Sequence, residues 1–360
     1  MEGLQLNKLD IFSDKETYEL LLDVDITYIN DILHETKAIV IDQNIVNLYN
    51  DKYRFDENKL IVIDAFEHLK TPETSLKICE EIMLKGVKRK DKIVAMGGGI
   101  TQDLVTFATS ILYRGIQWIW LPTTLLAQAD SCIGGKSSLN YKSWKNIIGN
   151  FYPPEKIIVQ SDFLNTLSEA DMRSGIGEIL KVHLLSGRKA ANLIIDQMRE
   201  YENNKSIISK MIFNSLELKN KILEIDPLDQ GLRLKMNYGH SFGHALEAAT
   251  NFGIPHGIAV TIGLDIANFV SMKMNRLSQE NFNTLHSLLQ SNLERSDFAT
   301  FKFDDFIEAL KKDKKNDAEN YNLIIPTEFG EVELTPLTMN EETNNLFKSY
   351  FQEFYQEGIK

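Results

Sequence analysis

A strand pattern that ends in three glycines limits the folds open to this chain. Ile93-Val94-Ala95-Met96 is a short apolar run, and Gly97-Gly98-Gly99 leads from it into a helical segment at 101–113. Similar apolar, β-branched runs occur at 38–42, 60–64 and 116–121. Strands that are apolar throughout are buried on both faces, so we expect an open, mostly parallel sheet covered by helices.

The pattern changes near residue 160. Helical spacing of apolar residues then dominates, at 168–185, 207–225, 240–250, 258–274 and 279–293. We therefore predict two domains: an α/β, Rossmann-like domain over residues 1–160 and an all-α domain over residues 161–360.

Composition excludes several classes of partner. The 360 residues carry a net charge of -12, which argues against binding to nucleic acid or to an anionic membrane surface. The two cysteines, Cys79 and Cys132, make no disulfide framework. The start of the chain lacks the basic and apolar regions of a signal peptide, and the most apolar stretch, 116–129, is interrupted by Pro122. We expect a cytoplasmic protein.

Three of the seven histidines, His240, His244 and His256, lie close together in the sequence. His240 and His244 are four apart and share a helix face, and a turn signal before His256 can bring it back to them. Three protein ligands with one open position are usual for catalytic zinc. The alternative is a helix with structural histidines, and Ser241 stands where zinc-protease helices have glutamate.

Other residues suit a metal and an anion. Glu178 and Lys181 share a helix face, where they form either a surface ion pair or part of a metal site with two histidines. The glycine turn suits a pyrophosphate, although it lacks the full dinucleotide fingerprint, and Asp103 can accept from a ribose hydroxyl or complement the helix dipole. Lysines and Arg233 could form a positive pocket for a phosphorylated carboxylate.

Taken together, these motifs resemble those of the 3-dehydroquinate synthases, a family of the sugar phosphate cyclase group. The match runs from about residue 42 to residue 315 and keeps the family's order. It comprises Asp42-x-Asn44, Glu67-x-x-Lys70, Gly97-Gly98-Gly99-x-x-x-Asp103, Tyr113-Arg114-Gly115, Pro122-Thr123-Thr124-Leu125-Leu126-Ala127-Gln128-Ala129-Asp130-Ser131, Gly134-Gly135-Lys136, Lys145-Asn146, Gly177-Glu178-x-x-Lys181, Lys219, Arg233-x-x-x-Asn237-x-x-His240-x-x-x-His244 and His256-Gly257.

The resemblance implies a role for each matching residue. The metal ligands, for zinc or cobalt, would be Glu178, His240 and His256. The catalytic residues would be Asp130, Lys136, Lys181, Asn237 and His244. The substrate would be held by Arg114 (from the neighbouring subunit of a homodimer), Asn146, Lys219, Arg233 and Lys314. NAD would contact Asp42, Asn44, Glu67, Lys70, Gly97, Gly98, Gly99, Asp103, Thr123, Thr124, Lys145, Phe163, Thr166 and Leu167.

The resemblance also implies a fold and a reaction. The fold is the dehydroquinate synthase-like pairing of a nucleotide-binding α/β domain with a helical metal-binding domain. The reaction converts 3-deoxy-arabino-heptulosonate 7-phosphate to 3-dehydroquinate and phosphate, by transient oxidation with NAD, phosphate elimination, reduction and aldol closure. Phe66 and Gln102 stand where the family usually has glycine, and both border the dinucleotide.

Three alternatives share parts of this pattern. Another sugar phosphate cyclase of a secondary pathway would use the same fold, NAD and metal on a different sugar, and Arg233 with Asn237 favours a substrate that carries a carboxylate. A metal-dependent alcohol dehydrogenase of the glycerol type would leave the basic residues unexplained. A non-catalytic scaffold would gain nothing from burying the metal-ligand set.

Overall fold

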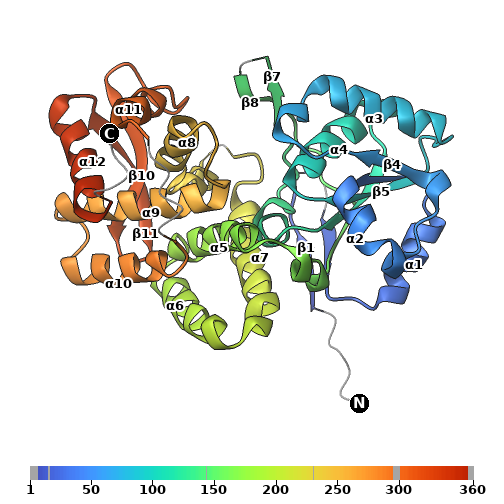
Figure 1. Ribbon diagram of the computed structural model, residues 1–360, viewed down its shortest axis with the longest axis horizontal. Helices are drawn as coiled ribbons and strands as arrows, with labels where there is room; N and C mark the ends of the chain where they lie inside the picture. Colours follow the sequence, from blue (N-terminus) through green and yellow to red (C-terminus); the bar gives the residue numbers. More distant parts are fainter. Residues whose placement is uncertain (1–6, 15–16, 143, 230, 295–300, 356–360) are drawn as a thin grey trace. The chain divides into compact units, whose positions relative to one another are not determined.

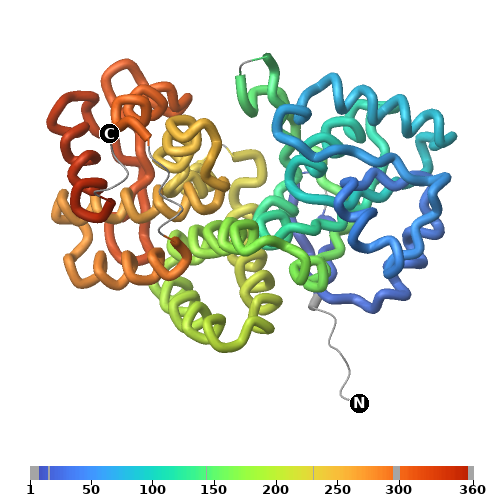
Figure 2. Tube along the Cα trace, viewed as in Figure 1, coloured from blue at the N-terminus to red at the C-terminus, as the bar shows by residue number. Residues whose placement is uncertain are grey.

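The computed structural model describes residues 7–14, 17–142, 144–229, 231–294 and 301–355. It divides into two compact units, unit 1 with Met1–Leu167 and Ile212–Leu228, and unit 2 with Ser168–Met211 and Asp229–Lys360. The chain therefore leaves unit 1 after Leu167, returns to it within a helix and leaves it again after Leu228, a path that Figure 2 traces by colour. Our assignment of functions to residues 1–160 and 161–360 stays a prediction.

Unit 1 is an α/β unit. Its strands are β1 (Asn7–Ile11), β2 (Tyr18–Leu22), β3 (Ile39–Asp42), β4 (Leu60–Ile63), β5 (Lys92–Gly97), β6 (Gln117–Pro122), β7 (Leu139–Tyr141), β8 (Trp144–Ile148) and β9 (Lys156–Val159). Its helices are α1 (Ile26–Glu35), α2 (Gln43–Tyr53), α3 (Pro72–Leu84), α4 (Gly99–Ile111) and the greater part of α7 (Ile208–Ile225). The apolar runs that predicted strands all fall on strands of this unit.

The main sheet has seven strands in the order β1-β2-β9-β6-β5-β3-β4. Every neighbouring pair is parallel except β1 with β2. From β3 the chain adds β4 on one side and then β5 on the other, so the direction of winding reverses between β3 and β5. Ligands of open α/β sheets bind beyond the carboxyl ends of the strands at such a reversal. Here those ends carry Asp42 and Gly97.

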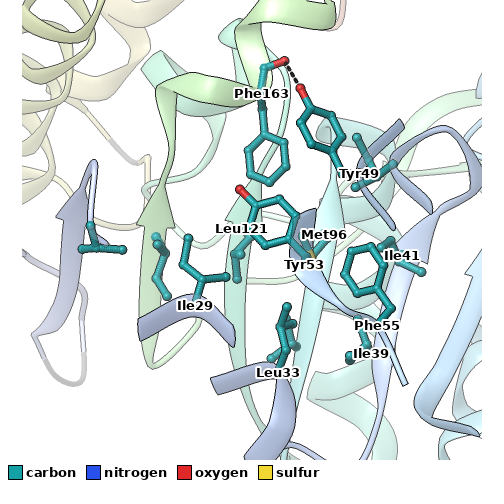
Figure 3. Packing of buried hydrophobic residues seen from close by; sticks show 14 of the residues in the cluster. Ile29, Leu33, Ile39, Ile41, Tyr49, Tyr53, Phe55, Met96, Leu121 and Phe163 are labelled. Carbon is teal, nitrogen blue, oxygen red and sulfur yellow. Dashed lines mark hydrogen bonds between the residues drawn. The ribbon is translucent and has the colours of Figure 1, made fainter. Parts of the chain in front are cut away.

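One face of the sheet is sealed by α1 and α2 through a shared apolar core. Ile39 and Ile41 point from β3 into this core, where they meet Ile29 and Leu33 of α1 and Tyr53 of α2. Figure 3 shows this packing, with the rings of Tyr53 and Phe163 stacked, their centroids 5.4 Å apart. Val40, between Ile39 and Ile41, is fully buried as well, so β3 is apolar on both faces, as expected for a parallel strand covered on both sides.

Unit 2 is helical apart from one hairpin. It contains α5 (Glu169–Leu184), α6 (Arg188–Asn203), α8 (His240–Ala249), α9 (His256–Lys273), α10 (Gln279–Gln290), α11 (Phe303–Lys311), α12 (Glu341–Phe354) and the antiparallel strands β10 (Asn320–Glu328) and β11 (Glu331–Thr338). The predicted fold class is confirmed in these main lines, and the hairpin, α6 and α11 are additions that the all-α prediction omitted. In the described part of the chain, no helix is both long enough and apolar enough to cross a bilayer.

Helix α9 runs through the middle of unit 2, between α8 and α10 (Figure 1). A buried carboxylate ties its neighbours to it. Asp265 Oδ2 accepts hydrogen bonds from His286 Nδ1 of α10 and from the Tyr350 hydroxyl of α12, both at 2.7 Å. Gln290 Nε2 of α10 is a third donor, at 3.2 Å. Asp265 is fully buried, so these donors replace water around Oδ2.

Helix α5 carries a fully buried histidine, His183, to which the family resemblance assigns no role. His183 Nδ1 lies 2.8 Å from the Ile179 carbonyl oxygen and donates to it, whereas its Nε2 has no hydrogen-bond partner within the described residues. Burial lowers the pKa of His183 to about 4. The folded chain therefore keeps this ring neutral in mildly acidic solution.

Replacing His183 with Gln should make thermal stability less sensitive to acid. The unfolded chain protonates this histidine below its ordinary pKa of 6.5, but the folded chain does so only near pH 4. The stability that comes from the neutral ring is thus lost as pH falls from about 6.5 toward 4, by about 2 kcal/mol between pH 7 and pH 5. Melting curves of both proteins across this range check the effect, and an identical pH dependence would contradict it.

Candidate functional site

The glycine turn of unit 1 leaves room for a ligand at one of its three positions. A Cβ on Gly97 would lie 2.3 Å from Thr101 Oγ1, which leaves no space for a side chain, and one on Gly98 would lie 3.0 Å from Thr124 Cγ2, a tight contact. A Cβ on Gly99 would meet nothing closer than Ser131 Oγ at 4.0 Å. Because Gly98 offers no side-chain cap to α4, the first N–H groups of that helix face this space and suit a phosphate.

Five residues predicted to contact NAD or the substrate form one polar network beside this turn. Lys70 Nζ donates to Asp103 Oδ2 at 3.1 Å and to Asn146 Oδ1 at 2.9 Å. Glu67 Oε1 lies 3.8 Å from Lys70 Nζ and 3.7 Å from Lys145 Nζ. Burial raises the pKa of the Asp103 carboxyl to about 6, against the opposing effect of Lys70. The network brings two carboxylates and two ammonium groups to the edge where the strands end.

Asn140 belongs to the same network, although sequence reasoning missed it. Its Nδ2 donates to Glu67 Oε1 at 2.9 Å, and its Oδ1 accepts from Asn146 N at 3.0 Å. It therefore connects Glu67 with Asn146. No motif marks this asparagine in the sequence, because its partners come from distant segments.

The remaining residues assigned to NAD are placed differently. Asp42 caps α2 by accepting from Asn44 N at 2.8 Å. Thr123 is buried and its N–H donates to the Gly97 carbonyl at 2.8 Å, beside Thr124. The ring of Phe163 is buried in the apolar core (Figure 3), which leaves only its backbone to a ligand. Its neighbours Thr166 and Leu167 lie at the end of the same short helical segment, Ser161–Thr166.

Gln102 and Phe66, which stand where the family usually has glycine, make different contacts. Gln102 is buried, donates to the Ser131 carbonyl at 2.6 Å and accepts from Ser131 Oγ at 2.9 Å. Phe66 is exposed and stacks on His68, with ring centroids 5.7 Å apart. Gln102 therefore ties α4 to the segment after β6 and does not enter the glycine turn.

Unit 1 also places three cations predicted for catalysis or substrate binding. Lys219 Nζ lies 2.7 Å from Asp130 Oδ1 and donates to the Asp130 carbonyl at 2.6 Å, with both side chains largely buried. Lys136 Nζ lies 5.8 Å from the Phe151 ring centroid. Arg114 is exposed and has a left-handed backbone with φ 63°, at the end of the short helical turn Leu112–Arg114.

In unit 2, the structure brings Glu178, His240 and His256 together. Glu178 Oε1 lies 3.6 Å from His240 Nε2 and 3.3 Å from His256 Nε2, and one ligand atom from each of the three residues falls within 4.8 Å of the others. Glu178 comes from α5, His240 from α8 and His256 from α9. Two imidazoles and a carboxylate are a usual ligand set for a catalytic divalent metal.

The hydrogen bonds of the two imidazoles favour the same interpretation. His240 Nδ1 lies 3.3 Å from the Tyr238 carbonyl oxygen, and His256 Nδ1 lies 3.2 Å from Glu247 Oε2. Since both partners are acceptors, each Nδ1 carries the proton and each Nε2 is left with a lone pair in the neutral ring. These lone pairs face a carboxylate oxygen, an arrangement that needs a cation, either a proton or a metal ion, between them.

The electrostatic environment shifts the pKa of each ligand of this cluster. Burial raises the pKa of Glu178, but the charge of Lys181 and the contacts with both histidines outweigh burial and hold that pKa well below its usual range. Burial and the nearby Lys181 also lower the pKa of His240, so this ring is neutral near pH 7. Burial lowers the pKa of His256 too, but its contacts with Glu178 and Glu247 outweigh burial and raise that pKa to about 10, so a metal ion would have to displace a proton from this ring. Lys181 Nζ lies 2.5 Å from Glu178 Oε2, with both side chains buried. This pair is therefore part of the site rather than a surface ion pair.

Glycines allow the three helices to approach closely enough to form the cluster. A Cβ on Gly177, beside Glu178, would lie 2.1 Å from the Gly257 carbonyl oxygen, and a Cβ on Gly257, beside His256, would lie 1.8 Å from the Ser174 carbonyl oxygen. On α8, a Cβ on Gly243 would lie 3.1 Å from the backbone of α9. Backbone contact between α5 and α9 thus fixes the distance between Glu178 and His256.

The other predicted residues of unit 2 lie on the same elements or beside them. Arg233 is buried in the short helical turn Leu232–Asn237, whose last residue, Asn237, donates to the Leu234 carbonyl at 3.0 Å. The His244 ring centroid lies 5.4 Å from that of His240 and 5.6 Å from that of His256. His244 thus borders the cluster without being one of its three ligands.

Of two adjacent lysines, the second lies nearer to these histidines. Lys314 is exposed. Lys315 is half-buried, pairs with Asp313 Oδ2 at 2.6 Å and acts electrostatically on His244. Sequence reasoning selected Lys314, because spacing alone does not distinguish two neighbours at the end of a helix.

The chain matches known proteins along most of its length. The profile of the 3-dehydroquinate synthase N-terminal family matches residues 60–174, and that of the C-terminal family matches residues 175–316. A 3-dehydroquinate synthase of Dictyoglomus thermophilum is 34% identical over 314 residues, which cover 86% of this chain and 87% of that protein.

Solved structures with the same fold include two synthases. The 2-epi-5-epi-valiolone synthase of Streptomyces hygroscopicus, solved with NAD+ and Zn2+, has a TM-score of 0.81 and 22% identity over 97% of this chain and 99% of that chain. A 2-deoxy-scyllo-inosose synthase, solved with carbaglucose-6-phosphate, NAD+ and Co2+, has a TM-score of 0.84 and 23% identity over 96% and 99%. At these identities the likeness shows the shared fold.

A series of glycine-to-alanine variants tests how the metal cluster is positioned. Gly177→Ala and Gly257→Ala should weaken zinc binding about ten- to a hundredfold and lower the melting temperature, because the added methyl group pushes α5 from α9 at an overpacking cost of about 1–3 kcal/mol. Gly243→Ala, where the added Cβ would lie 3.1 Å from its neighbours, should have a smaller effect. Zinc titration of the three variants checks this order. Wild-type affinity in Gly177→Ala would show that backbone contact does not set the site.

Proposed function

The chain belongs to the 3-dehydroquinate synthase family, and we propose that it converts 3-deoxy-arabino-heptulosonate 7-phosphate to 3-dehydroquinate and phosphate. The observation that carries the proposal is the cluster of Glu178, His240 and His256, whose lone pairs converge in a buried site beside Lys181. The family suggested by the motifs is thereby confirmed, and the roles of individual residues remain proposals.

We propose that this cluster holds zinc or cobalt and that NAD binds at the glycine turn of unit 1. Both fit the residues present, since the cluster offers two imidazole nitrogens and a carboxylate, and Gly99 leaves space at a helix start. When bound, the metal would polarise a substrate hydroxyl, and the dinucleotide would accept and return a hydride.

The chain's own side chains would hold the substrate and move its protons. Lys181 and His244 lie beside the metal ligands, so we assign proton transfer to them together with Asp130, Lys136 and Asn237. Arg233 is buried, and a buried guanidinium can hold a carboxylate by two parallel hydrogen bonds. Lys315 replaces Lys314 as our choice for a second cation, because its ammonium lies nearer to His244.

We further propose a homodimer and a cytoplasmic location. Arg114 is exposed on a left-handed turn, which suits a side chain that reaches the phosphate of a neighbouring subunit. With Asn146 and Lys219 it would complete the group that binds the substrate. Cys79 and Cys132 are both unpaired and buried, as expected for a protein of a reducing compartment.

A second candidate is another cyclase of the same group, because the valiolone and deoxy-inosose synthases have this fold. Such an enzyme would act on a sugar phosphate without a carboxylate. The buried Arg233 favours the acid substrate over a neutral one, because a guanidinium can bind a carboxylate by two parallel hydrogen bonds.

One assay decides between these functions. The purified chain, supplied with zinc, NAD and the seven-carbon phosphorylated keto acid, should release one phosphate for each cyclic product and accumulate no NADH, because the hydride is returned within each turnover. Faster turnover of a neutral sugar phosphate would support the other cyclase. Equimolar NADH without phosphate release would support an alcohol dehydrogenase and overturn the proposal.

A further inference from the structure

Glu247 is a residue of unit 2 to which the motif comparison assigns no role. It lies on α8, three positions after His244, and its side chain is 14% exposed. Its Oε2 lies 3.2 Å from His256 Nδ1. The carboxylate is therefore in contact with the outer nitrogen of an imidazole whose inner nitrogen faces Glu178.

We infer that Glu247 is a positioning residue, which sets the tautomer and orientation of His256 so that Nε2 is presented to the metal. This inference rests on the proposed metal site. A carboxylate beside Nδ1 accepts a hydrogen bond from the Nδ1–H group, so the neutral ring carries its proton there and its lone pair on Nε2. The same hydrogen bond makes the imidazole a stronger metal ligand.

The two imidazoles of the cluster are oriented by different kinds of group. His240 Nδ1 lies against a backbone carbonyl, that of Tyr238, so the fold itself orients this ring. His256 is the first residue of α9, follows Pro255 and has 35% of its side chain exposed. The His240 side chain is only 14% exposed, so packing restricts the rotation of the His256 ring less, and a side-chain contact is needed to hold it.

The segment before His256 makes this contact more important. Asn251 and Phe252 have left-handed φ values of 52° and 60°, and the turn that they form joins α8 to α9. Glu247 precedes the turn and His256 follows it, so their hydrogen bond closes the turn on itself. The same contact therefore links the metal ligand to the helix that carries His240 and His244.

A competing role for Glu247 is direct metal binding. His244, Glu247 and His256 also have ligand atoms within 4.8 Å of one another. A metal on that group would use Nδ1 of His256, whereas the proposed site uses Nε2, and would raise the zinc content to two per chain. Stoichiometry thus separates a positioning residue from a ligand.

Zinc affinity measured by competition with a coloured chelator tests the inference on the full chain. Glu247→Ala should bind one zinc about ten- to a hundredfold more weakly than the wild type, the usual effect of losing such a partner. Glu247→Gln should lose less, because its amide oxygen still accepts from Nδ1. Glu280→Ala, which removes an exposed glutamate of α10, is the matched control and should bind zinc as the wild type does.

Three results would overturn the inference. One is a zinc affinity within twofold of the wild type in both Glu247 variants. Another is a wild-type chain that binds two zinc ions, of which Glu247→Ala loses only the second. If Glu247→Ala does not fold, Glu247→Met, which also removes the acceptor, decides, and unchanged zinc affinity in it is the third. A wild-type chain that binds no zinc would instead refute the metal site itself, so failure of the inference and failure of the proposed function are distinguishable.

Discussion

Backbone contact between α5 and α9 is the constraint on which the candidate metal centre depends. Gly177 and Gly257 each leave no room for a Cβ against the other helix, and each is adjacent in sequence to a metal-ligand candidate. Because ligand distances must hold within a fraction of an ångström, the ligands are placed by rigid backbone rather than by long side chains. The packing of the helices in unit 2 therefore determines where its metal-ligand candidates lie.

Unit 1 forms its candidate site in a different way from unit 2. The direction of winding reverses between β3 and β5, and open α/β sheets bind their ligands beyond the carboxyl ends of the strands at such a reversal. Lys70, Asp103 and Glu67 form a network of ion pairs in the same unit. A dinucleotide needs an extended edge with a helix start, whereas a metal needs a buried point surrounded by ligands. Each unit provides the one that its architecture favours.

Much of this could be predicted from the sequence, for physical reasons. The strands β3, β5 and β6 carry continuous apolar runs, and His240 and His244 show helical spacing, so both patterns indicate local structure directly. The hairpin β10–β11 was not predicted, and its strand β10 packs against α9, a contact between distant segments that local patterns do not indicate. Glu247 and Asn140 were missed because their importance comes from partners in other segments, and the sequence left open which of Lys314 and Lys315 contacts the substrate. Phe163 illustrates the opposite case, since a residue expected to contact NAD has its ring in the core.

The measurement that tests the account most directly is X-ray absorption of the cobalt-loaded protein, compared between the wild type and His256→Ala. The account predicts one cobalt per wild-type chain with two imidazoles and one carboxylate among its ligands. In the variant, cobalt should be lost or should retain a single imidazole. An unchanged cobalt content with two imidazole ligands in His256→Ala would contradict the claim that Glu178, His240 and His256 form the metal centre.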